Sequence, residues 1–115
     1  MQHKQDLPYT GGCQCGAVRY RLKAAPLTVY NCHCRDCQKF TGSAFGTLVG
    51  LQQSELEIHG ELKSFSKVAD SGKAIVRLFC PECGSSVAEA PSNRPGMLIL
   101  NAGTLDDPTS VRPMA

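Results

Sequence analysis

The sequence is poor in aromatic residues. None of its 115 residues is Trp, and only four are Phe and three are Tyr. The 12 Lys and Arg residues are scattered along the chain and form no basic stripe. Proteins that bind nucleic acids usually carry a basic face, often with aromatic side chains that stack on bases. We therefore expect no nucleic-acid partner.

The sequence also lacks a long apolar run. No stretch approaches the roughly 20 apolar residues of a membrane-spanning helix, and no apolar segment typical of a secretion signal lies near the N-terminus. We therefore expect no membrane association and a cytoplasmic location. In a reducing compartment, a group of cysteines is more often a metal site than a disulfide framework.

Helical periodicity is nearly absent, and short alternating runs bounded by Gly, Pro, Asn and Asp indicate a mainly β fold. We expect one domain over residues 9–115, preceded by a flexible segment over residues 1–8. A short helical turn is expected at residues 35–40, ended by Gly42, and residues 70–73 (DSGK) indicate a hairpin turn. The expected strands cover residues 17–22, 27–32, 43–49, 56–59, 62–68, 74–79, 86–89 and 97–102.

Against this background, the seven cysteines are conspicuous. They form a C-x-C pair, a triplet in the stretch NCHCRDC, and a C-x-x-C pair followed by Gly. A structural zinc site usually takes four ligands, often from two distant pairs, whereas a catalytic site keeps three protein ligands and one open position. The spacing therefore predicts a closed and an open zinc site. The closed site would use Cys13, Cys15, Cys80 and Cys83, and the open site would use Cys32, Cys34 and Cys37.

Other interpretations of these residues stay open. The pairs can be redox dithiols, and the triplet can share a zinc ion with another site or bind no metal at rest. His33 stands between two expected ligands and is a candidate fourth ligand, although neighbouring side chains point apart in an extended chain. Arg35 and Lys39, four residues apart, are candidates to bind an anionic substrate or to form a solvated helical face.

Four stretches of the chain together resemble a known family. GGCQCGAVRY, CHCRDCQKFTGSAFGT, FCPECGSS and NAGTLDD, in this order, are similar to the glutathione-dependent formaldehyde-activating enzymes, a family that includes centromere protein V. The resemblance implies a β-tent fold with up to two zinc ions per chain. It assigns a structural zinc to Cys13, Cys15, Cys80 and Cys83, and a catalytic zinc to Cys32, Cys34 and Cys37.

The resemblance also implies a carbon–sulfur lyase, which reversibly joins formaldehyde to glutathione as S-hydroxymethylglutathione. The open zinc position would take a substrate sulfur beside the aldehyde, and Arg35 or Lys39 would attract a glutathione carboxylate. Two other hypotheses are a zinc-stabilised binding module without turnover and a thiol redox enzyme. The redox hypothesis fits less well, because the spare cysteines are clustered like metal ligands.

Overall fold

Short antiparallel strands make up most of the regular secondary structure, as the alternating sequence predicts. The computed structural model describes residues 7–68 and 72–113. Residues 1–6 of the expected flexible segment, and Asp70 and Ser71 of the expected hairpin turn, lie outside the described residues. None of the helices in the described part of the chain has the length and apolar character needed to span a membrane.

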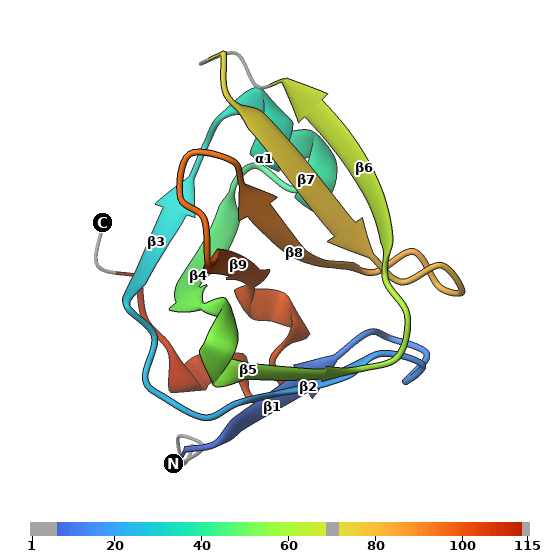
Figure 1. Cartoon of the computed structure of the whole chain (residues 1–115), viewed down its shortest axis with the longest axis vertical. Coiled ribbons are helices and arrows are strands. Elements are labelled where there is room, and N and C mark those ends of the chain that lie inside the picture. The colour runs from blue at the N-terminus through green and yellow to red at the C-terminus, as the bar shows by residue number, and fades with distance from the viewer. Residues whose placement is uncertain (1–6, 69–71, 114–115) are drawn as a thin grey trace.

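The strands form two antiparallel sheets. The smaller sheet has the order β1-β2-β5 and lies across the base of the molecule in Figure 1. Its strands are β1 (Tyr9–Gly12), β2 (Arg19–Leu22) and β5 (Leu56–His59). The larger sheet has the order β3-β4-β9-β8-β7-β6 and rises above this base. Its strands are β3 (Thr28–Cys32), β4 (Gly46–Gln52), β6 (Lys63–Val68), β7 (Ala74–Phe79), β8 (Ser86–Pro91) and β9 (Met97–Asn101).

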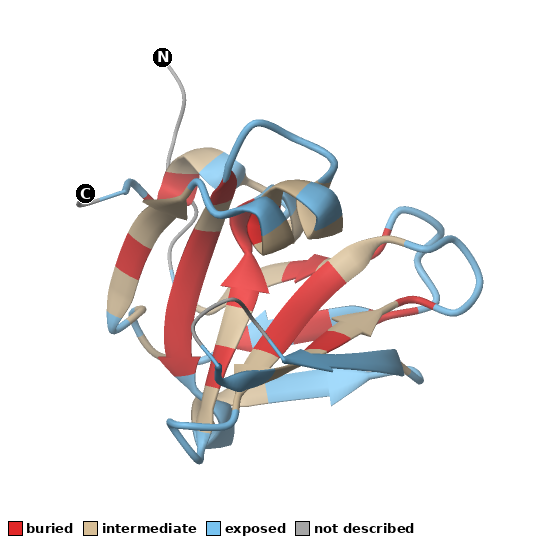
Figure 2. Ribbon diagram, turned by 90° about the horizontal axis from the view of Figure 1, so that it is seen from above, coloured by how far each residue is buried: buried red, intermediate tan, exposed pale blue. Residues whose placement is uncertain are grey.

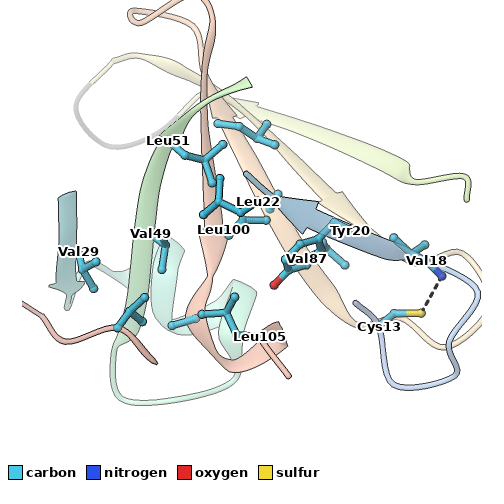
Figure 3. Close-up of a cluster of buried hydrophobic side chains, with 14 of the residues drawn as sticks. Cys13, Val18, Tyr20, Leu22, Val29, Val49, Leu51, Val87, Leu100 and Leu105 are labelled. Atoms are coloured by element: carbon cyan, nitrogen blue, oxygen red, sulfur yellow. Dashed lines mark hydrogen bonds between the residues drawn. The ribbon is translucent and has the colours of Figure 1, made fainter. Parts of the chain in front are cut away.

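The hydrophobic core lies between the two sheets. Tyr20 and Leu22 of β2 pack with Val49 and Leu51 of β4 and with Leu100 of β9 (Figure 3). All five side chains are at most 2% exposed, and burial of such a side chain contributes about 1.5–3 kcal/mol. Figure 2 shows the buried residues concentrated in the middle of the larger sheet, whereas β6 at its edge is exposed throughout.

The helices are few and short. Helix α1 (Arg35–Thr41) ends at Gly42, which has a φ of 69° and donates its N–H to the carbonyl of Gln38. The predicted helical turn is therefore confirmed, with one more residue at its end. Among the described residues, 3₁₀ turns follow at Gln53–Glu55, Ala102–Thr104 and Pro108–Ser110. The mainly β class, with one domain and short helices, is confirmed.

Two strands differ most from the prediction, and the bounds of five others differ from it by one or two residues. Strand β1 was not expected, because its sequence YTGG has two glycines and little strand propensity. The glycines are required there, since a Cβ on Gly11 would lie 2.4 Å from the carbonyl oxygen of Thr104 and 2.4 Å from the Tyr20 hydroxyl. Strand β4 runs three residues later than predicted, because its end pairs with β9 through Gln52 and Met97.

Candidate metal centres

The first cysteine group lies at the ends of two hairpins. Cys13 and Cys15 lie in the connection from β1 to β2, and Cys80 and Cys83 lie in the connection from β7 to β8. All four Sγ atoms lie within 4.8 Å of one another, with 3.6 Å from Cys13 to Cys15 and 3.8 Å from Cys15 to Cys80. Sulfurs placed tetrahedrally around zinc at about 2.3 Å are about 3.8 Å apart. The geometry therefore fits a closed zinc site, which we call the four-cysteine site.

Backbone amides point at the sulfurs of the four-cysteine site. Val18 donates its N–H to the Sγ of Cys13 at 3.2 Å (Figure 3), and Glu82 donates to the Sγ of Cys80 at 3.4 Å. The turn CPECG closes through a 2.9 Å bond from the N–H of Gly84 to the carbonyl of Cys80. Gly84 has a φ of 75°, which other residues rarely adopt. The local backbone thus orients both pairs of cysteines for a shared ion.

The thiols of the four-cysteine site differ in acidity. The hydroxyl and amide of Ser85, with the amide of Cys15, lower the pKa of Cys83 to about 5. For Cys15, the amide of Ala17 lowers the pKa, but the neighbouring thiols, Cys13 first, raise it to about 12. Sulfurs this close therefore do not all ionise together without a cation. Metal binding at this site should release protons.

The second cysteine group lies where β3 leads into α1. Cys32 is the last residue of β3, Cys34 caps the N-terminus of α1, and Cys37 lies in the first turn of the helix. The Sγ atoms of Cys32 and Cys34 are 3.4 Å apart, and all three Sγ atoms lie within 4.8 Å of one another. These distances suit three ligands of one ion. We call this group the three-cysteine site.

The thiols of the three-cysteine site also differ. Burial would raise the pKa of Cys34, but the backbone N–H of Cys37 and the neighbouring sulfurs lower it below its ordinary value. Burial raises the pKa of Cys37, and the sulfurs of Cys32 and Cys34 raise it further. An added cation would therefore be needed before all three thiols become thiolates, which are the forms that bind metal.

Among the described residues 7–68 and 72–113, no fourth His, Cys, Asp or Glu side chain lies close enough to join the three-cysteine site. His33, the candidate that the sequence offers, is exposed and its ring packs on Phe45 with 5.0 Å between the ring centroids. The three-cysteine site therefore differs from the four-cysteine site in having one position that these side chains leave open.

The three-cysteine site lines a pocket of about 560 Å³ on the larger sheet. Leu48 and Gly50 of β4 line this pocket, whereas Val49 and Leu51 of the same strand lie in the core. Because alternate residues of a strand face opposite sides of the sheet, the pocket lies on the face away from the core. A pocket of this size suits a small organic molecule. We call it the cysteine pocket.

Most charged side chains of the cysteine pocket are paired. Arg77 and Glu89 line the pocket, are 6% and 4% exposed, and form an ion pair. The guanidinium carbon of Arg77 also lies 4.9 Å from the centroid of the Phe40 ring. Asp36, another lining residue, is paired with Lys67 of β6. These pairs leave the wall of the pocket nearly neutral.

Two further polar residues of the pocket were not expected from the sequence. Tyr30 of β3 lines the pocket, and burial, followed by the nearby sulfurs, raises its pKa. Arg94, in the loop between β8 and β9, also lines the pocket. Arg94 is far from the cysteines in the sequence, so local patterns did not indicate it. Tyr30 is only two residues before Cys32, and the alternation of β3 places both on the same face of the strand, a signal that was missed. For Arg94, the prolines at 91 and 95 indicated a loop but no role for the residue.

The predicted anion-binding residues lie elsewhere. Arg35 is exposed and donates to the side chain of Gln38 at 2.8 Å, and Lys39 is exposed and borders two other pockets. Neither residue lines the cysteine pocket. Their contact with a substrate stays a prediction, and the structure offers Arg94 as a different candidate.

Comparison with known proteins identifies the family of the chain. The family model described as glutathione-dependent formaldehyde-activating enzyme matches residues 8–115. The chain therefore belongs to this family.

Two similar proteins have low sequence identity to the chain. A protein of Schizosaccharomyces pombe named as an uncharacterized lyase is 28% identical over 94 residues, which cover 82% of this chain and 66% of that protein. The chain thus matches slightly less than two thirds of the length of this relative. A crystal structure of a Rhodobacter sphaeroides protein has the same fold, with a TM-score of 0.67 and 22% identity, over 90% of this chain and 91% of that one.

Proposed function

We propose that the protein is a zinc-dependent carbon–sulfur lyase that makes and breaks the adduct of a small thiol and a small aldehyde. One observation carries this proposal: the three-cysteine site lines a pocket of about 560 Å³ and has no fourth ligand among the described His, Cys, Asp and Glu side chains. A site with three protein ligands and adjoining space for a ligand is typical of catalytic metal sites.

The four-cysteine site has a different role in this proposal. Its ligands come from two hairpins of different sheets, so a bound ion would join the base of the molecule to the larger sheet. Cys13 and Cys80 are buried. We therefore assign this site to structural zinc, whose binding energy stabilises the fold.

The chemistry at the three-cysteine site begins with the thiol. A zinc ion bound by Cys32, Cys34 and Cys37 would supply an open position for a substrate thiolate. The N–H of Cys37 donates to the Sγ of Cys34 at 3.4 Å and stabilises negative charge there. Three thiolates exceed the charge of one divalent ion, so the site favours positioning of a thiolate over strong polarisation of a carbonyl.

The proposed reaction is the addition of a thiol to a carbonyl and needs no oxidant or reductant. In the forward direction, a bond forms between the thiol sulfur and the aldehyde carbon, the π electrons of the carbonyl move to its oxygen, and the thiol proton ends on that oxygen. Tyr30 lines the same pocket, and its hydroxyl can donate a hydrogen bond to the oxygen as charge develops. The reverse reaction releases the aldehyde and the thiol.

Glutathione and formaldehyde are the substrates that we propose, giving S-hydroxymethylglutathione. Membership of the formaldehyde-activating family supports this choice, and the name of the Schizosaccharomyces pombe relative supports lyase chemistry. Free cysteine ligands and glutathione both suit a reducing compartment, so we place the protein in the cytoplasm.

Isotope exchange tests the proposed function. Under conditions of equilibrium, the zinc-loaded protein should accelerate the exchange of labelled formaldehyde with its glutathione adduct. The same reaction without protein is the necessary control, because the adduct also forms unaided. The variant Cys34→Ser should exchange at the uncatalysed rate. Wild-type protein that binds two zinc ions and still gives only the uncatalysed rate would favour a binding module without turnover.

A further inference from the structure

The charges around the cysteine pocket point to the way in which a thiol substrate is recognised. Two acidic residues line the pocket, and each has a cationic partner: Glu89 is paired with Arg77, and Asp36 with Lys67. Arg77 is also packed against the ring of Phe40 and is 6% exposed. Arg77 is therefore held in the wall of the pocket and is not available to a substrate.

Arg94 is in a different situation. It lines the cysteine pocket, it is exposed, and the described part of the chain offers its guanidinium no ion-pair partner or hydrogen bond. Its backbone is fixed on both sides, because its N–H donates to the carbonyl of Pro91 at 3.4 Å and its carbonyl accepts from Met97 at 3.1 Å. The loop therefore holds the backbone of Arg94 next to the pocket that Arg94 and the three cysteines line.

The guanidinium of Arg94 is best suited to bind a carboxylate. A guanidinium presents planar pairs of N–H donors that match a carboxylate, and the pairing is stronger than a neutral hydrogen bond. The three-cysteine site itself has negative charge when its thiols ionise, so it repels a carboxylate that has no cation beside it. A carboxylate on the substrate is therefore most stable next to Arg94.

We propose that Arg94 binds one carboxylate of the thiol substrate and is the single carboxylate-binding residue of the cysteine pocket. The inference rests on the proposed function, since it takes the pocket as the thiol site. Glutathione has two carboxylates, and only one of them would be paired with a pocket cation. The substrate class is then a thiol with one correctly placed carboxylate.

Calorimetry with zinc-loaded protein and no aldehyde tests this inference. The probes are glutathione and its two monoamides, in which one or the other carboxylate is neutralised. One monoamide should bind about tenfold or more weakly than glutathione, and the other should bind nearly as well. In Arg94→Gln, glutathione itself should weaken by a similar factor and the difference between the monoamides should disappear. Arg94→Lys should retain part of the difference, because it keeps the charge without the paired donors.

The control is Arg21→Gln, which removes an exposed arginine of β2 in the other sheet and should change no affinity. Three results would overturn the inference: no binding of glutathione, equal weakening by both amidations, or a difference between the monoamides that survives in Arg94→Gln. The inference would also be overturned if the difference between the monoamides disappeared in Arg35→Gln or Lys39→Gln and not in Arg94→Gln. Because no aldehyde is present, binding as expected without catalysed exchange would leave the role of Arg94 intact and reject only the lyase activity.

Discussion

The Sγ of Cys34 accepts a hydrogen bond from the backbone N–H of Cys37 at 3.4 Å, so one candidate zinc ligand is also the N-cap of the helix that contributes another. Residues that cap helices satisfy N–H groups that otherwise have no partner in the first turn. The formation of α1 and the assembly of the three-cysteine site are therefore linked through this pair.

Substitution of Cys34 separates the two roles. Cys34→Ser keeps an oxygen that can cap α1, whereas Cys34→Ala does not, and both remove the sulfur. Both variants should fold with one zinc ion fewer than wild type and should lose catalysed exchange. The alanine variant should be less stable than the serine variant by about 1 kcal/mol in urea denaturation. Equal stability of the two would show that the cap contributes nothing measurable.

The metal content of the protein is a second expected outcome. Purified under reducing conditions, the chain should contain between one and two zinc ions, because it has two groups of cysteines with suitable spacing. Elemental analysis together with a protein concentration from amino-acid analysis gives the ratio. A folded protein with no zinc would rule out both sites, whereas one zinc ion would leave the four-cysteine site filled and the three-cysteine site empty or labile.

Cys80 tests the structural role of the four-cysteine site. Its side chain is completely buried and its sulfur accepts the N–H of Glu82. Cys80→Ser should unfold the domain, because binding of structural zinc contributes about 10–16 kcal/mol of apparent free energy in small domains. Circular dichroism and one-dimensional NMR show whether the fold persists. Comparable stability of Cys80→Ser and Cys34→Ser would mean that the assignment of the two sites is wrong.

The ion pair of Arg77 and Glu89 makes a prediction about stability. Both side chains are buried, so Glu89→Leu leaves a buried cation without its partner and should cost about 3–5 kcal/mol. The double variant Arg77→Met with Glu89→Leu should be clearly more stable than the sum of the single changes predicts. Urea denaturation of the four proteins forms a double-mutant cycle. Additive effects would mean that the two side chains do not interact.

Much of the fold was predictable from local patterns. Alternating segments such as 56–59 and 74–79 gave strands with the bounds seen in the structure, since their residues have strand propensity and lie between turn residues. Strand β1 was missed because Gly11 serves a close approach to Tyr20 and Thr104, which are distant in sequence. A glycine required by tertiary packing looks like a turn residue in the sequence.

The candidate site was also predictable only in part: its cysteine groups were predicted, and its pocket was not. Short spacings such as that of Cys32, Cys34 and Cys37 are local and predicted the grouping that the structure brings together. The cysteine pocket is not local, because β3, β4, β7, β8 and β9 contribute to it. Arg94 is one basic residue among many in the sequence, and only the sheet order brings its loop to the pocket that the cysteines line. The sequence therefore suggested Arg35 and Lys39, which are near the triplet along the chain.

The central claim is that the three-cysteine site binds a metal ion with one position open to a substrate sulfur. The most direct measurement is the absorption spectrum of the cobalt-substituted protein during titration with glutathione, since thiolate-to-cobalt charge-transfer bands change when a further sulfur binds. The bands should change in wild type and should not change in Cys34→Ser, in which the four-cysteine site still contains cobalt. A wild-type spectrum that ignores every small thiol, but changes in His33→Ala, would contradict the account, because the fourth position would then belong to the protein.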